Sequence, residues 1–255
     1  MRLRKKIPSL ALTLSQQFHE QTKIKKIPHE LPMEKWPDSW KKVTFKGYPR
    51  FSALRLSKPK KMSVKFSEVL DKRKSTRKYS PIALDEPKLS SLLYHVAGIR
   101  EKNEFMQANR FYPSAGARYP LEVYPLVFNV KGIKSGIYHY YVKNHLLEYL
   151  PTPVDFQTKA LNYFSNTDWT KNTAVIFIIS AVFFRNQVKY GERGYRHILT
   201  ELGSILQNVY LVSSALNLGC CPTGGYMDDK FNSLLDLDGV EESVIGAIAI
   251  GNVDI

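Results

Sequence analysis

The sequence has 255 residues, of which 44% are hydrophobic, and a formal net charge of +14. This length and apolar content fit one sizeable globular core, alone or with an extension. No apolar run approaches the roughly 20 residues of a membrane-spanning helix, so we expect no segment that crosses a membrane. The two cysteines, Cys220 and Cys221, are adjacent, which excludes a disulfide framework and a cysteine-based zinc site, and we expect no bound metal.

The positive charge is concentrated at the start of the chain. Residues 1–61 hold 16 Lys/Arg and 4 Asp/Glu, a net charge of +12, whereas the remaining 194 residues have a net charge of +2. Such a segment either attracts an acidic partner or peptide or is a solvated arm. No zinc finger, recognition helix or RNA-binding aromatic signature accompanies it, so we expect no nucleic-acid partner.

The N-terminal segment is expected to lie on the rest of the protein. It opens with MRLRKKIPSLALTLSQQF, which has no A-x-A cleavage site, so we favour a cytoplasmic protein over one with a signal peptide. Residues 31–51 lack periodicity but carry five aromatic residues, and disordered tails rarely hold so many. We therefore interpret residues 1–61 as a basic arm wrapped on a body that spans residues 62–255.

The first half of the body is predicted to hold two helices, a strand and a hairpin. Residues 63–75 have helical periodicity with Ser63 as a possible N-cap. Residues 85–100 have Asp85 at the cap and Pro87 in the first helical turn. Alternating and β-branched patterns predict the strand over residues 121–130 and the hairpin over residues 136–150.

The second half is predicted to hold two strands and the longest helix. Residues 173–184 form a continuous β-branched and aromatic run, which is typical of a strand buried on both faces. Residues 194–219 form a helix that is apolar around more than half its circumference, so it is expected in a core or a dimer interface, with Gly219 at its end. Residues 243–251 form a short apolar strand. Helices and strands alternate without a regular βαβ rhythm, which favours the α+β class.

The stretch RKSTRKY, residues 73–79, follows the first helix of the body. Arg73, Ser75 and Arg77 place two guanidinium groups and a hydroxyl within five residues. They would make a good phosphate clamp, because arginine offers a planar fork of donors. Basic residues at a helix C-terminus also complement the helix dipole without binding a ligand. From this motif alone the second interpretation is favoured.

Two later loops are rich in small residues. Small side chains at residues 113–116 allow the backbone to approach a flat ligand, although an ordinary loop explains them equally well. Residues 218–228 expose the amides of paired glycines after the long helix, or form a simple helix-stop loop. No strand precedes that helix in the way a dinucleotide-binding G-x-G-x-x-G requires. The candidate residues are Pro113, Ser114, Ala115 and Gly116 in the first loop, and Pro222, Gly224 and Gly225 in the second.

In their order and spacing, these pieces resemble one family. The sequence is similar to the FMN-dependent nitroreductase superfamily, and within it to the SagB-type, McbC-like dehydrogenases of thiazole/oxazole-modified peptide biosynthesis. RKSTRKY resembles the family's Arg-x-Ser-x-Arg-x-aromatic start, and YPSAGARYPLEVY resembles its Tyr-Pro-Ser-Gly-Gly-like loop and strand. The most specific signal is KYGERGYRHILTELGSILQNVYLVSSALNLG, which resembles the long helix. The resemblance covers residues 62–255 and extends back to about residue 31.

The resemblance implies a fold, a cofactor and a set of ligand contacts. The fold would be α+β, with a central, mostly antiparallel sheet flanked by helices, in an intertwined homodimer with two FMN molecules at the interface. Arg73, Ser75 and Arg77 would hold the FMN phosphate and ribityl chain. The 113–116 loop would line the flavin, often from the neighbouring subunit, and the 222–225 loop would lie near the flavin ring.

Two features depart from the family pattern. Gly224 stands where classical nitroreductases have Glu, which argues against the NAD(P)H-dependent pattern. The sequence ends at AIGNVDI, without the Lys-x-Arg element that helps many members bind phosphate. The phosphate clamp would then rely on Arg73, Arg77 or another cation, such as one from the basic arm.

Lys189 and Tyr190 stand just before the long helix, where the azoline-oxidising branch has its proposed catalytic dyad. The resemblance implies that a thiazoline or oxazoline ring loses a hydride to flavin N5 and a proton to Lys189, with Tyr190 as a relay or orienting group. A lysine partly desolvated beside a flavin can have its pKa lowered enough to be neutral and basic. Without the resemblance, the two residues would be interpreted as a surface pair that precedes a helix.

Three functions stay open at this point. The first is FMN-dependent oxidation of azoline rings in a ribosomal peptide, with a second copy of the chain and other peptide-modifying enzymes as partners. The second is NAD(P)H-dependent reduction of nitroaromatics or quinones on the same fold. The third is a flavin-binding subunit that scaffolds a peptide-modifying complex through its basic arm.

Overall fold

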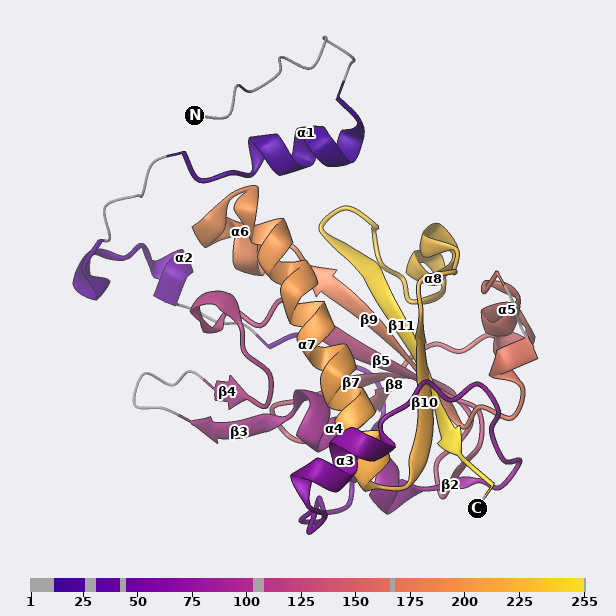
Figure 1. Ribbon diagram of the computed structural model, residues 1–255. Coiled ribbons are helices and arrows are strands. Elements are labelled where there is room, and N and C mark those ends of the chain that lie inside the picture. Colours follow the sequence, from indigo (N-terminus) through magenta and orange to yellow (C-terminus); the bar gives the residue numbers. More distant parts are fainter. Residues whose placement is uncertain (1–11, 26–30, 42–44, 103–107, 166–167, 255) are drawn as a thin grey trace, which may run out of the picture.

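A seven-stranded antiparallel sheet runs through the protein, with helices on both faces (Figure 1). The computed structural model describes residues 12–25, 31–41, 45–102, 108–165 and 168–254. The start of the chain, on which the choice between a signal peptide and a cytoplasmic arm depends, lies at residues 1–11, outside the described residues. Among the residues that are described, no helix has both the length and the hydropathy needed to cross a bilayer.

The main sheet has the strand order β1-β8-β7-β5-β9-β11-β10, and every neighbouring pair is antiparallel. Two short pairs lie beside it, β2 with β6 in parallel and β3 with β4 antiparallel. The α+β class with a mostly antiparallel central sheet is therefore confirmed. The main strands are β1 Ala53–Arg55, β5 Leu121–Val127, β7 Gly136–Tyr141, β8 Leu146–Tyr149, β9 Val175–Val182, β10 Leu218–Thr223 and β11 Glu242–Asn252; the short ones are β2 Leu84–Asp85, β3 Ile99–Lys102, β4 Ala108–Arg110 and β6 Val130–Lys131.

Alternate side chains of the central strands enter two separate cores. In β9, Phe177 and Ile179 belong to the core under α4 and α7, whereas Ile176 and Ile178 belong to the core under α5 and α8. Successive residues of a strand point to opposite faces of a sheet, so both faces of β9 are covered, as its apolar run predicted. The helices concerned are α4 Glu86–Ala97, α5 Phe156–Asn162, α7 Arg193–Ala215 and α8 Asp228–Leu234.

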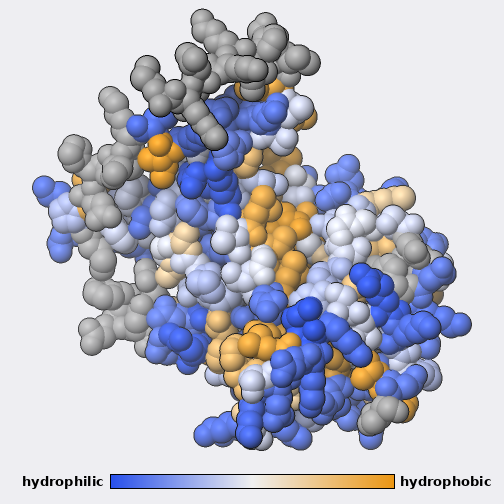
Figure 2. Space-filling model, viewed as in Figure 1, coloured by the Kyte–Doolittle hydropathy of each residue, from blue (hydrophilic) through white to orange (hydrophobic). Residues whose placement is uncertain are grey.

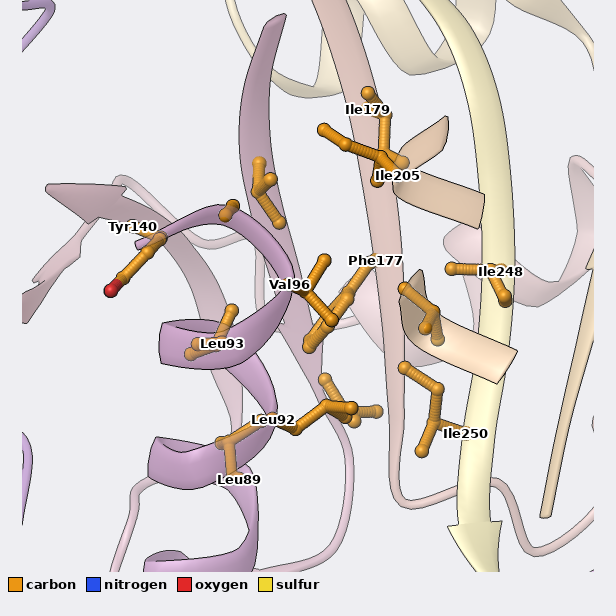
Figure 3. Close-up of a cluster of buried hydrophobic side chains, with 14 of the residues drawn as sticks. Leu89, Leu92, Leu93, Val96, Tyr140, Phe177, Ile179, Ile205, Ile248 and Ile250 are labelled. Atoms are coloured by element: carbon orange, nitrogen blue, oxygen red, sulfur yellow. The ribbon is translucent and has the colours of Figure 1, made fainter. Parts of the chain in front are cut away.

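The core under α4 and α7 fixes the long helix on the sheet. Figure 3 shows Val96 of α4 and Ile205 of α7 converging on Phe177 and Ile248 of the strands. All four side chains have 0% exposure. Burial of a side chain of this size contributes about 1.5–3 kcal/mol, so the position of α7, and of every residue it carries toward a site, is strongly determined.

The end of α7 differs from the prediction. The helix ends at Ala215, and Asn217 makes the reversal with a φ of +54°, a left-handed conformation that asparagine tolerates. Gly219 does not end the helix; it pairs with Gly251 inside β10. A Cβ at Gly219 would lie 2.6 Å from Val253 Cγ1 and 2.7 Å from Thr76 Cγ2, so the glycine is needed for close packing. The region taken as a helix-stop loop is therefore a strand as far as residue 223.

The first helix of the body, α3 (Phe66–Lys72), also begins later than expected. Lys65 occupies its N-cap position instead of Ser63, and Val69 is its buried residue. Phe66 and Leu70 are 67% and 45% exposed. In Figure 2, apolar side chains gather down the middle of the shown face, over α7, and again below it, over α3. The helix thus has an apolar side that this chain leaves uncovered.

The described parts of the N-terminal segment contact the body at three places. The helix α1 (Leu14–Gln21) lies beside the start of α7, where Arg196 Nε donates to Thr22 Oγ1 at 2.7 Å. The helix α2 (Asp38–Lys41), which follows the η1 turn (Met33–Lys35), lies beside α6 (Phe184–Tyr190) (Figure 1). Further along, β1 adds an edge strand to the main sheet.

Candidate active site

The loop that contains residues 113–116 is fastened to α7 by a buried glutamate. Ser114 Oγ donates to Glu201 Oε1 at 2.8 Å, and the Ala115 backbone N–H donates to the same oxygen at 3.2 Å. Ser114 Oγ in turn accepts the Tyr119 backbone N–H at 2.8 Å. The short turn η2 (Ala115–Ala117) is therefore held at both ends.

Gly116 brings this loop against the Lys189-Tyr190 pair. Its φ is +61°, in the left-handed region that favours glycine. A Cβ at this position would lie 2.5 Å from Tyr190 Oη and 3.4 Å from Lys189 Nζ. Two groups that the sequence placed more than 70 residues apart thus meet at one point, and the absence of a side chain at Gly116 makes that contact possible.

The pair itself lies in the last turn of α6, among aromatic rings. Lys189 Nζ is 3.7 Å from the centroid of the Trp36 ring, 5.5 Å from that of Trp40 and 5.6 Å from that of Tyr190. The Tyr190 ring makes an edge contact with His197, with centroids 5.0 Å apart. Partial burial raises the pKa of the Tyr190 hydroxyl, and nearby Arg118 opposes that rise. Gly191, with a φ of +53°, ends α6 and turns the chain into α7.

Glu201 is a site residue that sequence reasoning missed. Its side chain is on the buried face of α7, 3% exposed, and burial raises the pKa of its carboxyl to about 7. Its Oε1 accepts the two hydrogen bonds from the loop, whereas Oε2 has no hydrogen-bond partner among the described residues. The signal in the sequence was a glutamate between Ile198 and Ile205 in the apolar stripe, since a charged residue rarely occupies such a position without a function or a partner.

A second group of candidate residues gathers at the other end of α7. The segment that holds Arg73, Ser75 and Arg77 runs beside β10. Ser75 and Cys220 form an isolated parallel β-bridge there. Ser75 Oγ and Tyr210 Oη are 2.6 Å apart, and the Arg73 guanidinium lies 5.1 Å from the Tyr210 ring centroid. Arg77 is exposed. These contacts leave a hydroxyl and two guanidinium groups along one extended stretch.

The loop after β10 lies further toward the start of α7, because Thr223 pairs with Ala247, next to Gly246, which packs against Leu202. Pro222 is still paired with Ile248 inside the sheet. The Gly225 carbonyl accepts the Ser165 backbone N–H at 2.9 Å, and a Cβ at Gly225 would lie 2.2 Å from Ser165 Oγ. A Cβ at Gly224, by contrast, would meet nothing within 4 Å. Gly224 therefore borders open space, while Gly225 is packed.

Within one chain, the two groups are separate. Glu201, which holds the 113–116 loop, and Tyr210, which contacts Ser75, are nine residues apart on α7, which corresponds to about 13 Å along the helix axis. The structure thus brings the 113–116 loop together with Lys189 and Tyr190, and brings Ser75 together with β10. It does not bring these two sets together.

Additional cations lie next to the second group. A cavity of about 1230 Å³ opens between the 72–88 segment, the end of α7 and the last residues of β11. Asp85 and Asp254 also line it, so its charge is not uniform. The lysines that line it are Lys72, Lys74, Lys78 and Lys88. Positive charge near Arg73 and Arg77 is therefore supplied by the body itself.

Comparison with known proteins identifies the family. The model of the nitroreductase family matches residues 70–252. A nitroreductase-family protein of Methanocaldococcus jannaschii is 34% identical over 177 residues, which cover 68% of this chain and 85% of that protein. The chain belongs to the nitroreductase family. Its members are oxidoreductases, and so is this nitroreductase-family chain.

Two further relatives of this nitroreductase-family chain process peptides. The microcin B17-processing protein McbC of Escherichia coli is 33% identical over 138 residues, 51% of this chain and 49% of McbC. The trifolitoxin-processing protein TfxB of Rhizobium leguminosarum is 33% identical over 143 residues, 54% of this chain and 38% of TfxB. The chain thus spans half or less of the length of these two relatives.

Solved structures agree on the fold. The E. coli microcin synthetase McbBCD complex, solved with truncated pro-MccB17 bound, contains a chain that matches with a TM-score of 0.60 and 21% identity, over 94% of this chain and 92% of that one. A nitroreductase-family protein of Desulfovibrio desulfuricans, solved in complex with FMN, matches with a TM-score of 0.51 and 16% identity, over 74% and 87%. At these identities the likeness shows the nitroreductase fold alone.

Proposed function

We propose that the protein is an FMN-dependent dehydrogenase of the SagB type, which oxidises thiazoline or oxazoline rings of a ribosomal peptide to azoles. The observation that carries this proposal is the meeting of Lys189 and Tyr190 with Gly116 of the 113–116 loop. That meeting places an amine and a hydroxyl at the edge of the loop that would line a flat cofactor. The peptide-processing relatives McbC and TfxB support the same reaction class.

The residues fit FMN by shape and by charge. Gly116 offers backbone without a side chain beside Tyr190, and Gly224 borders open space, so a flat ring can approach both. Arg73 and Arg77 alternate with Ser75 on an extended stretch, which suits a phosphate and a polyhydroxyl chain. Lys74 and Lys78, which alternate with them in the sequence, line the neighbouring cavity.

The chemistry assigns a separate task to each member of the pair. Oxidation of an azoline to an azole removes two hydrogens, one with its electron pair and the other as a proton. FMN, when bound, supplies the acceptor for the electron pair. The neutral amine of Lys189 takes the proton from the ring carbon and becomes an ammonium group. The Tyr190 hydroxyl, next to Gly116, orients the ring or relays the proton onward.

A homodimer would complete the site. Since the 113–116 loop and the 73–77 segment contact α7 nine residues apart, at Glu201 and Tyr210, one FMN contacts both sets most simply when a second copy contributes one of them. The uncovered apolar side chains of α3, Phe66 and Leu70, are a suitable surface for that copy. The peptide substrate and other peptide-modifying enzymes are the further partners in this proposal, which also keeps residues 1–61 as an arm distinct from the body.

Reduction of small molecules by NAD(P)H is the second candidate. The observation in its favour is coverage: the chain spans 85% of the M. jannaschii nitroreductase-family protein but only 49% of McbC. Rapid anaerobic bleaching of the bound flavin by NADPH would favour this alternative. The presence of Gly224 where classical members have Glu weighs against it.

The first experiment is to record the visible spectrum of the purified protein and to identify any chromophore released on denaturation. We expect FMN at about one per chain. Next, the double variant Lys189→Ala/Tyr190→Phe, still loaded with flavin, is assayed on a synthetic thiazoline-containing peptide. We expect a loss of about 10²-fold or more, because general acid–base groups typically contribute 10²–10⁴-fold. Full activity of the flavin-loaded double variant would falsify the proposed roles.

A further inference from the structure

Two indole rings of the N-terminal arm lie close to the Lys189 amine, in addition to the Tyr190 ring of the body. Trp36 lies 3.7 Å from Lys189 Nζ, measured to the ring centroid, and Trp40 lies at 5.5 Å. The two indoles make an edge contact with one another, with centroids 6.1 Å apart. An ammonium group over the face of tryptophan is attracted by the ring quadrupole, and tryptophan is the strongest of the aromatic partners.

The body is built to hold this part of the arm. Arg118, 4% exposed, donates from Nη1 to the Trp40 carbonyl at 2.7 Å and from Nη2 to the Ser39 carbonyl at 2.9 Å. Its Nε donates to the Arg185 carbonyl of α6 at 2.6 Å. A buried guanidinium must keep its acceptors, and two of these three come from the arm. Trp40 Nε1 also donates to the Val188 carbonyl at 3.0 Å, one residue before Lys189.

We propose that Trp36 is a positioning residue of the reaction site, which holds the Lys189 amine against Gly116 and Tyr190 and stabilises its protonated form. This inference rests on the proposed function, in which Lys189 accepts a proton from the substrate ring. The ammonium group over Trp36 is the product of that transfer, so the indole favours the forward direction of the proton step. The basic arm, whose role the sequence left open, thereby supplies part of the site.

Among the described residues, other charged groups lie near this region on the loop, on α6, on α7 and on the arm. Arg118 lies in the loop, and Tyr190 is the neighbour of Lys189 on α6. The arm's own charged residues beside the two indoles, Glu34, Lys35, Asp38 and Lys41, are exposed. The groups that α7 contributes are Arg193, His197 and Glu201. Replacement of Trp36 removes none of these charged groups. A shift in the titration midpoint of Lys189 in a Trp36 variant is therefore assigned to the loss of the indole ring.

The experiment measures the titration of Lys189 directly. The rate at which Lys189 is acylated by a small anhydride is followed against pH by mass spectrometry, in the full-length protein with its flavin and again after the flavin is stripped. Trp36→Leu keeps the site apolar but removes the aromatic ring. The pH midpoint of Lys189 acylation should therefore fall by roughly 0.5–1.5 units, which corresponds to the energy of a cation–π contact. Trp36→Phe keeps a π face and should restore most of the shift.

A matched control lies elsewhere on the same arm. Phe18 contacts the Tyr195 ring edge-on at 5.5 Å and the Arg196 guanidinium at 5.8 Å, away from Lys189. Phe18→Leu should leave the Lys189 midpoint unchanged. An unchanged or raised midpoint in Trp36→Leu, or an equal shift in Phe18→Leu, would overturn the inference.

Turnover separates this inference from the proposed function. On the synthetic thiazoline peptide, the rise of kcat/KM with pH should move to lower pH in Trp36→Leu by the same amount as the labelling midpoint. If the wild type does not turn over the thiazoline peptide, the proposed function fails, and if Lys189→Ala retains turnover, the proposed catalytic role of Lys189 fails. The labelling result stands in both cases. If turnover depends on Lys189 but the labelling midpoint ignores Trp36, the inference fails and the proposed function stands.

Discussion

Two glutamates of this protein are equally buried, and burial has had opposite outcomes for them. Glu122 on β5 and Glu201 on α7 are each 3% exposed. Burial alone would raise the pKa of Glu122, but the Arg185 guanidinium and His139 outweigh it and lower that pKa to about 2. Glu201 has only uncharged donors, from Ser114 and Ala115, so burial prevails and its pKa rises to about 7.

The difference shows what each part of the molecule is built to do. Glu122 belongs to a closed ionic network: His139 Nε2 contacts it at 3.2 Å, and His139 Nδ1 contacts Glu148 at 2.8 Å. A carboxylate held in this way stays charged across the physiological range and supports the sheet. Glu201, beside the 113–116 loop, can exist in either protonation state near neutral pH. Such carboxyl groups are characteristic of functional sites.

The largest expected effect comes from breaking the charged network. Glu122→Ala would leave Arg185 and His139 buried without their shared carboxylate, and removal of one partner from a buried ion pair typically costs about 3–5 kcal/mol. Urea or thermal unfolding should show a loss of this size in the free energy of unfolding. Glu101→Ala, which removes an exposed partner of Arg100, is the matched control and should leave it unchanged. Equal effects of the two variants would contradict the assigned network.

A smaller effect is expected when the same network is titrated. The pKa of Glu122 is about 2 in the folded protein against an ordinary 4.5, so its contribution is complete above pH 4.5 and is lost as pH falls toward 2. The difference corresponds to about 3 kcal/mol. The hydrogen bonds from His139 to Glu122 and Glu148 outweigh burial and raise its pKa above 6.5. Its contribution is therefore complete below pH 6.5 and is lost as pH rises through the folded value.

The measurement for this second prediction is the free energy of unfolding between pH 2.5 and 8, for the wild type and for Glu122→Gln. The wild type should lose stability steeply below pH 4.5, whereas the variant should show a much flatter acid limb. Parallel acid limbs would mean that other carboxyl groups govern the acid sensitivity.

The sequence predicted the elements of the site better than the contacts within it. The apolar run of β9 and the apolar stripe of α7 follow from local periodicity, which is visible within a single segment of the sequence. The contact between Trp36 and Lys189 depends on how the arm crosses α6, and this tertiary arrangement cannot be predicted from sequence periodicity. The helix end was misjudged because Asn217 and Gly219 both suit a left-handed turn, and packing against Thr76 assigned the glycine to a strand.

Only the family resemblance, which implied that the 113–116 loop often contacts the flavin from the neighbouring subunit, pointed to the separation of the two candidate groups. Ser75 and Gly116 were expected to serve one cofactor, and their motifs say nothing of distance within a chain. Their partners on α7, Tyr210 and Glu201, decide it, because the helix is rigid and fixes the spacing. Glu201 itself could be noticed as a carboxyl in an apolar stripe, but its pKa depends on which donors reach it, and those come from a loop 86 residues away.

The smallest expected effect concerns Glu201 and the hydroxyl of Ser114 that donates to it. Ser114→Ala removes the hydroxyl that donates to Glu201 and accepts from the Tyr119 backbone N–H, so stability should fall by about 1–2 kcal/mol. That hydroxyl stabilises the charged carboxylate, so its loss should raise the pKa of Glu201 further above 7. Carbon-13 NMR of labelled glutamate carboxyls measures that pKa, with Glu201→Gln to assign the signal. Ser204→Ala, on the same helix but bonded to the Thr200 carbonyl, should leave the Glu201 titration in place. If the pKa stays near 7 in Ser114→Ala, then the loop does not control the charge of Glu201, and the contrast with Glu122 would be one of burial alone.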